Sequence, residues 1–279
     1  MPREPLSVVL ITFNNADTLD ACLREVDWAD EIVVLDSGSS DDTVAIARRH
    51  GARVATHPFD DYGPQKQRVI EMASHDWILN LDADEILSPG TRAVIEQALV
   101  APRHAGFRLP RRERMFWSVQ HRLSHRNGHL RLFDRRRARM NDVPVHAAVE
   151  ADGPVKTLRA ADFVNDGDGD IAARVDKINR YSSGMVADKQ ARGQRFSGVM
   201  MVVYPPIFFL RQFLFKRYFL SGWAGFVASV LGAFYVFLKY AKVFEAQKTG
   251  NREQGTGNES PRYPFFSVPR SPLPVPAFP

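Results

Sequence analysis

The chain has 279 residues, an apolar composition of 44% and a single cysteine, Cys22. This length fits one large domain or one domain with an appendage, and the apolar fraction suffices for a buried core, which excludes global disorder. One cysteine excludes internal disulfides and cysteine-rich zinc modules, so we expect a reducing compartment. The first apolar run stops at Thr12. It is too short for a signal peptide, so we expect the N-terminal part to stay in the cytoplasm.

The net charge of +5 hides an uneven distribution. Residues 1–100 carry 8 basic and 18 acidic side chains, whereas residues 101–217 carry 23 basic and 11 acidic ones. Twelve arginines, no lysine and only two acids lie between Arg103 and Arg139. Because arginine binds phosphate bidentately, the second half is expected to meet an anionic saccharide or lipid headgroup. The alternative is a solvated face. Nucleic acid is not expected, because no RRM, KH or helix-turn-helix pattern accompanies the charge.

Strand and helix patterns alternate along the first part of the chain. Apolar runs predict buried strands at residues 6–12, 31–36 and 76–81, and a further short strand is expected at 53–56. Helical patterns follow each of them, at residues 19–26, after 39–42, at 64–74 and after 88–89. The order predicts an α/β fold with a doubly wound, mostly parallel sheet. Ligands of such sheets bind at the carboxyl ends of the strands.

Polar and acidic residues follow three of these strands. The first strand ends at Thr12 and Asn14, the second at Asp36, and the fourth at Asp82 and Asp84. Carboxylate oxygens suit Mg²⁺ or Mn²⁺, which bind diphosphate, so the last pair predicts a metal–diphosphate site. The alternative is that both acids are loop residues that cap the next helix. Neither a dinucleotide fingerprint nor a P-loop is present.

Three further residues have a ligand-binding and a structural interpretation. Asp36 is suited to accept hydrogen bonds from a base or ribose, or else to form an Asx-turn. Lys66 and Arg68 lie near a helix start, where phosphates are favoured, or else are exposed helix charges.

Four segments together resemble the family 2 nucleotide-sugar glycosyltransferases of GT-A fold, in both order and spacing. They are LSVVLITFNN, EIVVLDSGSSDDT, GPQKQR and WILNLDADE. The closer resemblance is to the bacterial lipopolysaccharide core glucosyltransferase branch, and it covers residues 6–245. The segments that carry it are LRLF, PVH, DGPV, KINRYS and FLKYAK.

This resemblance implies inverting transfer of a hexose from a nucleotide-diphosphate sugar to a lipid-linked or lipopolysaccharide core saccharide. It implies a divalent cation, Mg²⁺ or Mn²⁺, on Asp84. The implied nucleotide-sugar-binding residues are Thr12, Asn14, Asp36, Lys66, Arg68 and Asp82.

The catalytic base is where the chain departs from the family pattern. The PVH motif is commonly followed by Glu, but Ala147 stands here and cannot take a proton. Glu150, Asp142 and His146 remain as candidates to deprotonate the acceptor hydroxyl. Ala147 also motivates an alternative, a nucleotide-sugar-binding protein with weak or no transferase activity. A nucleotidyltransferase is disfavoured, because no Gly-rich loop follows the first strand.

The C-terminal part is strongly apolar. Residues 218–238 carry no charged side chain, over a length that can span a bilayer. Basic residues flank both sides, so the positive-inside rule gives no orientation. We expect helices that lie in the cytoplasmic leaflet of the inner membrane, peripheral or monotopic, with one transmembrane helix at 218–238 as the alternative.

The expected organisation therefore has four parts. A donor-binding half at residues 1–100 precedes an acceptor and catalytic half at 101–195. Apolar membrane-associated helices at 196–248 and a disordered tail at 249–279 complete the chain.

Overall fold

The computed structural model describes residues 2–141, 147–167, 169–191 and 198–255. The chain divides into two compact units, which are described separately. Unit 1 comprises Met1–Arg114 and Arg126–Gly167, and unit 2 comprises Met115–His125 and Asp168–Pro279.

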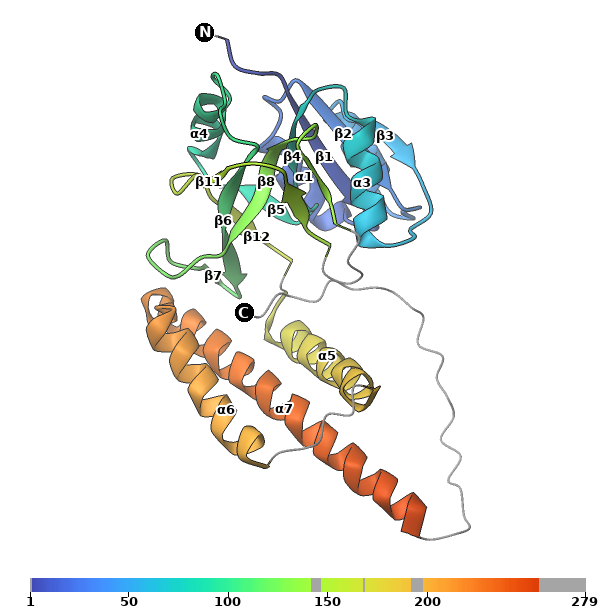
Figure 1. Cartoon of the computed structure of the whole chain (residues 1–279), viewed down its shortest axis with the longest axis vertical. Helices are drawn as coiled ribbons and strands as arrows, with labels where there is room; N and C mark the ends of the chain where they lie inside the picture. Colours follow the sequence, from blue (N-terminus) through green and yellow to red (C-terminus); the bar gives the residue numbers. More distant parts are fainter. Residues whose placement is uncertain (1, 142–146, 168, 192–197, 256–279) are drawn as a thin grey trace. The chain divides into compact units, whose positions relative to one another are not determined.

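Unit 1 contains the α/β part of the chain (Figure 1). Its helices are α1 (Ala16–Arg24), α2 (Thr43–Arg49), α3 (Tyr62–Met72) and α4 (Thr91–Ala98). Its first strands are β1 (Leu6–Thr12), β2 (Glu31–Asp36), β3 (Arg53–Thr56), β4 (Trp77–Asn80) and β5 (Glu85–Leu87). The later strands are β6 (Gly106–Met115), β8 (Gly128–Asp134), β9 (Ala138–Met140), β10 (Val149–Ala151), β11 (Val155–Thr157) and β12 (Phe163–Asn165).

The strand pairing confirms the α/β prediction. β1 lies parallel to both β2 and β4, and β2 lies parallel to β3. The main sheet has the order β3-β2-β1-β4-β8-β6-β12-β5. β8 is antiparallel to β4 and β6, and β12 is antiparallel to β5. The four predicted strands thus form the parallel half of a mixed, mostly parallel sheet. This agrees with the expected doubly wound, GT-A-like fold.

Helices cover both faces of this parallel half. Leu6, Val8 and Leu10 of β1 belong to one hydrophobic core, which α1, α2 and α4 complete. Val9 belongs to the other core, to which α3, β8 and β9 contribute. A strand buried on both faces must be continuously apolar, which is why β1 shows no polar alternation. The parallel register sets Thr12 opposite Asp36, so the carboxyl ends of β1 and β2 share one edge.

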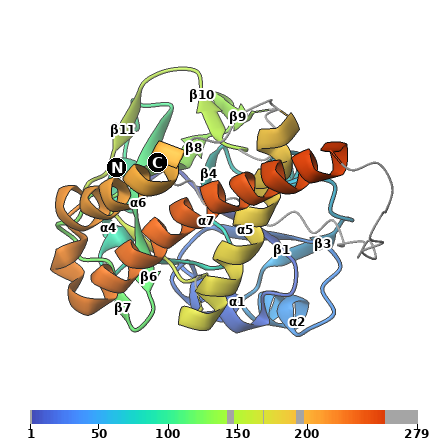
Figure 2. The same cartoon turned by 90° about the horizontal axis from the view of Figure 1, so that it is seen from below.

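Unit 2 is mainly helical (Figure 2). Its elements are β7 (Ser118–Val119), α5 (Ile171–Ala191), α6 (Gly198–Leu210), a π-helical turn (Arg211–Phe215), a 3-10 turn (Tyr218–Ser221) and α7 (Gly222–Gly255). α7 packs against both α5 and α6. Two stretches are long and apolar enough to cross a membrane, Gly198–Phe215 and Tyr218–Lys248, with mean hydropathy 1.5 and 1.6. The expected boundary at residue 249 falls within α7, and residues 256–279 of the expected tail lie outside the described residues.

Candidate active site

The loop after β2 is organised around the Asp36 carboxylate, which is 1% exposed. Its Oδ1 accepts hydrogen bonds from the hydroxyls of Thr12 (2.8 Å) and Ser39 (2.6 Å). Its Oδ2 accepts from the backbone N–H groups of Gly38 (2.9 Å) and Ser39 (2.8 Å). Both oxygens therefore hold the 37–39 loop in shape, which is the structural role that the sequence left open for Asp36.

Asn14 ties the loop after β1 to the loop after β2. Its backbone N–H donates to Ser39 Oγ at 2.8 Å, and its Oδ1 accepts from the Ser40 N–H at 2.9 Å. The φ of Asn14 is +52°, in the left-handed region that Asn tolerates better than most residues. The predicted residues Thr12, Asn14 and Asp36 thus lie in one hydrogen-bonded group at the sheet edge.

Asp82 lies directly beyond β4 and is held by two cations. Lys66 Nζ of α3 lies 2.5 Å from its Oδ1, and the Arg131 guanidinium of β8 lies 2.8 Å from its Oδ2. Burial alone would raise the pKa of Asp82, but the positive charges of Arg131 and Lys66 outweigh it and hold that pKa well below its usual range. Asp82 is therefore ionised and fixed in position, and the structure brings Lys66, another residue of the predicted site, beside it.

Glu85 completes a buried charge network that the sequence did not reveal. The same Arg131 nitrogen also pairs with Glu85, whose other oxygen accepts the Asp82 backbone N–H at 3.1 Å. Burial alone would lower the pKa of Arg131, but the two carboxylates hold it above its usual range. Arg131 belongs to the family-like segment LRLF and Glu85 to WILNLDADE, but the resemblance implied no role for either residue. A basic residue inside a buried strand was the signal that could have identified Arg131.

Asp84 has a different environment from Asp82. Its Oδ2 accepts from the Asn165 amide at 3.2 Å, and in the described part of the chain it forms no ion pair with a basic residue. Burial and the negative charge of Asp82 raise the pKa of Asp84. Asp82 and Asp84 do not cap the next helix, because β5 follows them and Gly90 is the N-cap of α4.

The side chains around Asp84 fit a hard divalent cation that takes most of its ligands from water and substrate phosphates and only one or two from the protein. Among the described residues, no group of three or more His, Cys, Asp or Glu side chains could hold a metal ion alone. Mg²⁺ keeps several waters and is bound through one or two carboxylates together with substrate phosphates. One carboxylate without a basic partner, beside a second carboxylate, matches that mode of binding.

Arg68 does not reach this group. Its guanidinium donates to Gln65 Oε1 at 3.0 Å and pairs with Asp60 at 3.1 Å. Gln65 in turn donates to Ser37 Oγ at 3.2 Å. Arg68 is thus linked to the loop after β2 through Gln65, not to Asp82.

Of the three candidates for the catalytic base, the structure describes only Glu150. Asp142 and His146 lie outside the described residues. Glu150 is exposed on β10 and accepts from the Asn141 amide at 3.2 Å. Among the residues described here, it makes no hydrogen bond or ion pair with Asp82, Asp84 or Lys66. Ala147 is partly buried against the core that contains α3.

The family assignment follows from comparison with known proteins. The model of the family described as "Glycosyl transferase family 2" matches residues 7–151, which contain all the residues of the group around Asp82. The chain is a family 2 glycosyltransferase. It is 30% identical to a lipopolysaccharide core biosynthesis glycosyltransferase, LpsC, of Rhizobium meliloti (strain 1021), over 88% of this chain and 94% of that one. It is also 30% identical to an uncharacterized glycosyltransferase of Rickettsia felis, over 87% of this chain and 90% of the relative.

Solved structures resemble this glycosyltransferase over a smaller part. One is glucosyl-3-phosphoglycerate synthase from Mycobacterium tuberculosis, in complex with Mn²⁺, uridine diphosphate and glucosyl-3-phosphoglycerate. It matches with a TM-score of 0.34 and 26% identity, over 40% of this chain and 44% of that chain. Mannosyl-3-phosphoglycerate synthase from Rubrobacter xylanophilus matches with a TM-score of 0.35 and 25% identity, over 39% of this chain and 41% of that chain. The chain thus spans less than half of these solved proteins.

Proposed function

We propose that this glycosyltransferase moves a hexose, with inversion, from a nucleotide-diphosphate sugar to a lipid-linked or lipopolysaccharide core saccharide at the cytoplasmic face of the inner membrane. The observation that carries the proposal is the pair of unlike carboxylates after β4. Asp82 is neutralised by Lys66 and Arg131, whereas Asp84 has no basic partner among the described residues. The named relative in lipopolysaccharide core biosynthesis supports the acceptor class.

The geometry of the site supports a donor-side role for each of the following residues. Thr12, Asn14 and Asp36 shape the loops that receive the base and ribose. Lys66 and Arg131 keep Asp82 ionised, and Arg68 fixes Gln65 beside the loop after β2. Asp84 supplies a carboxylate oxygen to Mg²⁺ or Mn²⁺. Such a cation, when bound, supplies Lewis-acid neutralisation of the departing diphosphate.

The acceptor hydroxyl needs a base on the opposite face of the sugar from the leaving group. Glu150, Asp142 and His146 remain the proposed residues for this proton transfer. Glu150 is exposed and carries one hydrogen bond, from Asn141.

The decisive test is a donor screen with the purified full chain, in which release of the nucleotide diphosphate is measured in the presence of Mn²⁺. The screen should include UDP-hexoses and a core saccharide acceptor. We expect release that depends on the acceptor. Tight donor binding without any release would instead support the alternative, a nucleotide-sugar-binding protein, which Ala147 favours.

The metal site has its own test. Asp84→Asn should weaken Mn²⁺-dependent binding of a UDP-sugar by at least about 10-fold in calorimetry, because the cation loses its carboxylate ligand. Asp27→Asn is the matched control, since Asp27 is an exposed acid just beyond α1, near the amino end of β1. Unchanged binding by Asp84→Asn would contradict the metal assignment.

The base is located by comparing Glu150→Gln, Asp142→Asn and His146→Gln in single-turnover transfer. A general base contributes about 10²–10⁴-fold to the rate, so the variant that loses this factor identifies it. Donor binding should stay unchanged in that variant. Normal rates in all three would remove every candidate.

A further inference from the structure

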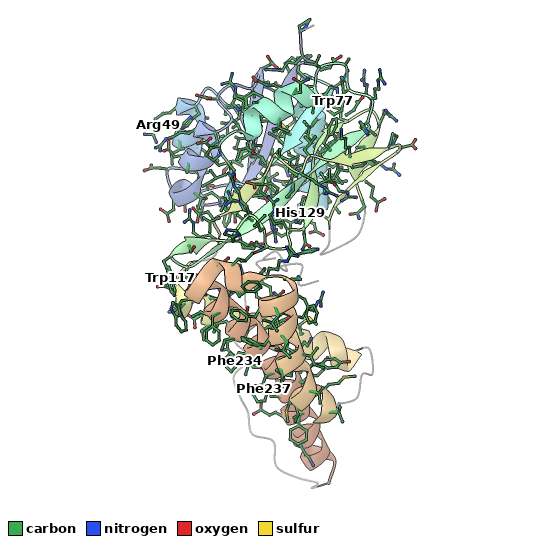
Figure 3. All side chains as sticks on the ribbon, turned by 90° about the vertical axis from the view of Figure 1, so that its left-hand side faces the viewer. Arg49, Trp77, Trp117, His129, Phe234 and Phe237 are labelled. Carbon is green, nitrogen blue, oxygen red and sulfur yellow. The ribbon has the colours of Figure 1, made fainter. Side chains whose placement is uncertain are left out.

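Helix α7 carries an exposed apolar stripe. Trp223, Phe226, Val230, Phe234 and Phe237 are 37–76% exposed and recur every three or four residues, which places them on one face of the helix. Phe234 and Phe237 project from the same helix in Figure 3. Another face of α7 is covered, because Ser229, Val236 and Val243 are buried and the helix packs on α5 and α6. An exposed stripe of this size marks an interaction surface.

The start of α7 is hydrogen-bonded to the 115–125 loop, which connects strands β6 and β8 of the sheet. The His121 N–H donates to Ser221 Oγ at 3.0 Å, and Ser124 Oγ donates to the Arg217 carbonyl at 2.9 Å. The loop 115–125 leaves β6 and continues into β8. A membrane therefore cannot separate this end of α7 from the transferase sheet.

The far end of the apolar stretch of α7, well before the helix ends at Gly255, is bonded to α5. Lys242 Nζ donates to the Asn179 carbonyl at 2.8 Å, to Asn179 Oδ1 at 2.6 Å and to Ser183 Oγ at 2.8 Å. α5 follows β12 through the segment 166–178, which carries several charged side chains. A helix needs about 20 mostly apolar residues to cross the hydrocarbon core, so this segment cannot cross it. Asn179 therefore lies on the same side as the sheet.

The two bonded ends are far apart along α7. At 1.5 Å per residue, the helix extends roughly 32 Å from Ser221 to Lys242, close to the ~30 Å thickness of a hydrocarbon core. A spanning α7 would place these ends on opposite sides of the bilayer. The contacts above require both ends on one side, although length and composition alone would allow a span.

We propose that α6 and α7 form a monotopic docking surface for one anionic leaflet. α7 lies along the leaflet with its apolar stripe among the acyl chains, and both of its ends remain on the side of the transferase sheet. Trp117 and Leu123 of the 115–125 loop, 64% and 67% exposed, add apolar side chains beside the first end. Basic residues near both ends suit anionic headgroups, namely Arg211, Lys216, Arg217, Lys239 and Lys248. This inference rests on contacts within unit 2 and not on transferase activity.

Sidedness is tested by cysteine labelling in membranes of the expressing bacterium. Arg122→Cys and Lys248→Cys, made separately in the full chain, place a thiol at an exposed polar position near each end of α7. The parent chain is the background control, because Cys22 is buried. We expect a membrane-impermeant maleimide to label both variants in inside-out vesicles and neither in spheroplasts. Labelling of the two positions from opposite sides would show that α7 spans the bilayer and would overturn the proposal.

The leaflet preference is tested by flotation of the purified full chain with vesicles of phosphatidylcholine, with or without 30% phosphatidylglycerol. The double variant Phe234→Glu/Phe237→Glu should lose at least half of the bound fraction on the anionic vesicles. Ile171→Glu is the matched control, since Ile171 is similarly exposed, at 43%, but lies on α5. Circular dichroism verifies that the double variant is folded. A folded double variant that floats normally, or equal flotation of the parent on both vesicle types, would contradict the proposal.

Discussion

At the residue scale, Arg131 joins three residues of the candidate site. It is 9% exposed, and it pairs with Asp82 and Glu85 while its guanidinium lies over the Phe163 ring. Removing this buried cation leaves the buried Glu85 without its partner, although Asp82 keeps Lys66, and such a loss costs more than the intact pair contributes. Arg131 thus joins β8 to the loop after β4 and positions Asp82.

We therefore expect Arg131→Met to destabilise the fold by about 3–5 kcal/mol, measured by urea unfolding of the full chain in detergent. Arg92→Met is the control, because Arg92 forms an exposed pair with Glu96 on α4 and its loss should cost less than about 1 kcal/mol. If the two substitutions lowered the free energy of unfolding by similar amounts, the buried network would stabilise the fold no more than an exposed ion pair does.

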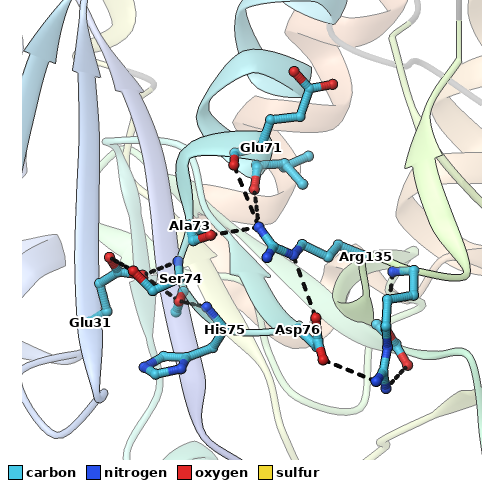
Figure 4. Close-up of polar contacts among 11 residues, drawn as sticks. Glu31, Glu71, Ala73, Ser74, His75, Asp76 and Arg135 are labelled. Atoms are coloured by element: carbon cyan, nitrogen blue, oxygen red, sulfur yellow. Dashed lines mark hydrogen bonds and ion pairs between the residues drawn. The ribbon is translucent and has the colours of Figure 1, made fainter.

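Glu31 is a second residue whose charge stabilises the fold, at the start of β2 (Figure 4). Its carboxylate accepts from the Ser7 hydroxyl (2.6 Å) and the Ser74 N–H (2.7 Å), and pairs with Arg53 (2.7 Å). Burial alone would raise the pKa of Glu31, but these donors lower it from 4.5 to about 2.

This lowered pKa gives the stability a defined pH dependence. A depressed folded pKa stabilises the protein above the unfolded value of 4.5, and that contribution is lost as the pH falls from 4.5 toward about 2. The loss amounts to about 3 kcal/mol. Glu31→Gln should flatten this part of a pH series of urea midpoints, whereas Glu71→Gln, at an exposed position on α3, should not. An unchanged slope in Glu31→Gln would argue against the assignment.

At the element scale, the close approach of β6 and β8 depends on Gly106. A Cβ there would lie 2.7 Å from Leu130 Cδ1 and 2.9 Å from the Leu132 carbonyl oxygen, so the strands would have to separate. This pairing also carries Arg131, since β8 lies between β4 and β6. The geometry of the candidate site therefore depends on a glycine outside it.

Gly106→Ala should destabilise the protein by about 1–3 kcal/mol through overpacking. Gly184→Ala is the matched control, because a Cβ at Gly184 in α5 meets nothing within 4 Å. The control should be stabilised by up to about 1 kcal/mol, since Ala is the better helix former. Thermal unfolding by circular dichroism compares the two, and a neutral Gly106→Ala would show that the strands adjust without cost.

At the scale of the whole molecule, the uneven charge of the sequence has a partly internal explanation. Seven of the twelve arginines between 103 and 139 pair with carboxylates: Arg111, Arg112, Arg114, Arg126, Arg131, Arg135 and Arg136. Several of their partners, such as Asp76 and Asp82, belong to the acidic first hundred residues. The acidic front and the basic middle therefore neutralise each other in part, so the arginine count alone overstated the surface available to anionic partners.

The binding of the helical unit to an anionic membrane should depend on salt concentration. If basic residues near the ends of α7 meet anionic headgroups, raising ionic strength from 0.05 to 0.5 M should lower the bound fraction on anionic vesicles. Binding to phosphatidylcholine vesicles is the control, because it depends on the apolar stripe alone. A salt response of equal size on both vesicle types would contradict the electrostatic contribution.

The sequence by itself determined the parallel half of the fold and the family. The apolar runs of β1, β2 and β4 are local signals, since a strand buried on both faces must be mostly apolar. The short β3 is only partly buried, but all four strands formed where they were predicted. The polar strand ends likewise indicated that Asp36 and Asp82 lie at one edge of the sheet, whereas Lys66 was proposed from its place near a helix start. Such features are visible because they are set by residues close together in the chain.

The tertiary structure alone decided which charges meet. Arg131 reaches Asp82 and Glu85 because β8 inserts antiparallel to β4, setting Leu132 opposite Leu79. Nothing in the local pattern of β8 encodes this partner strand. The sequence also left open whether α7 spans the bilayer or lies along one leaflet. Hydropathy gives the length of an apolar stretch but not which polar groups bind its two ends. The hydrogen bonds of Ser221 and Lys242 link distant segments of the chain, and the proposed placement of α7 rests on them.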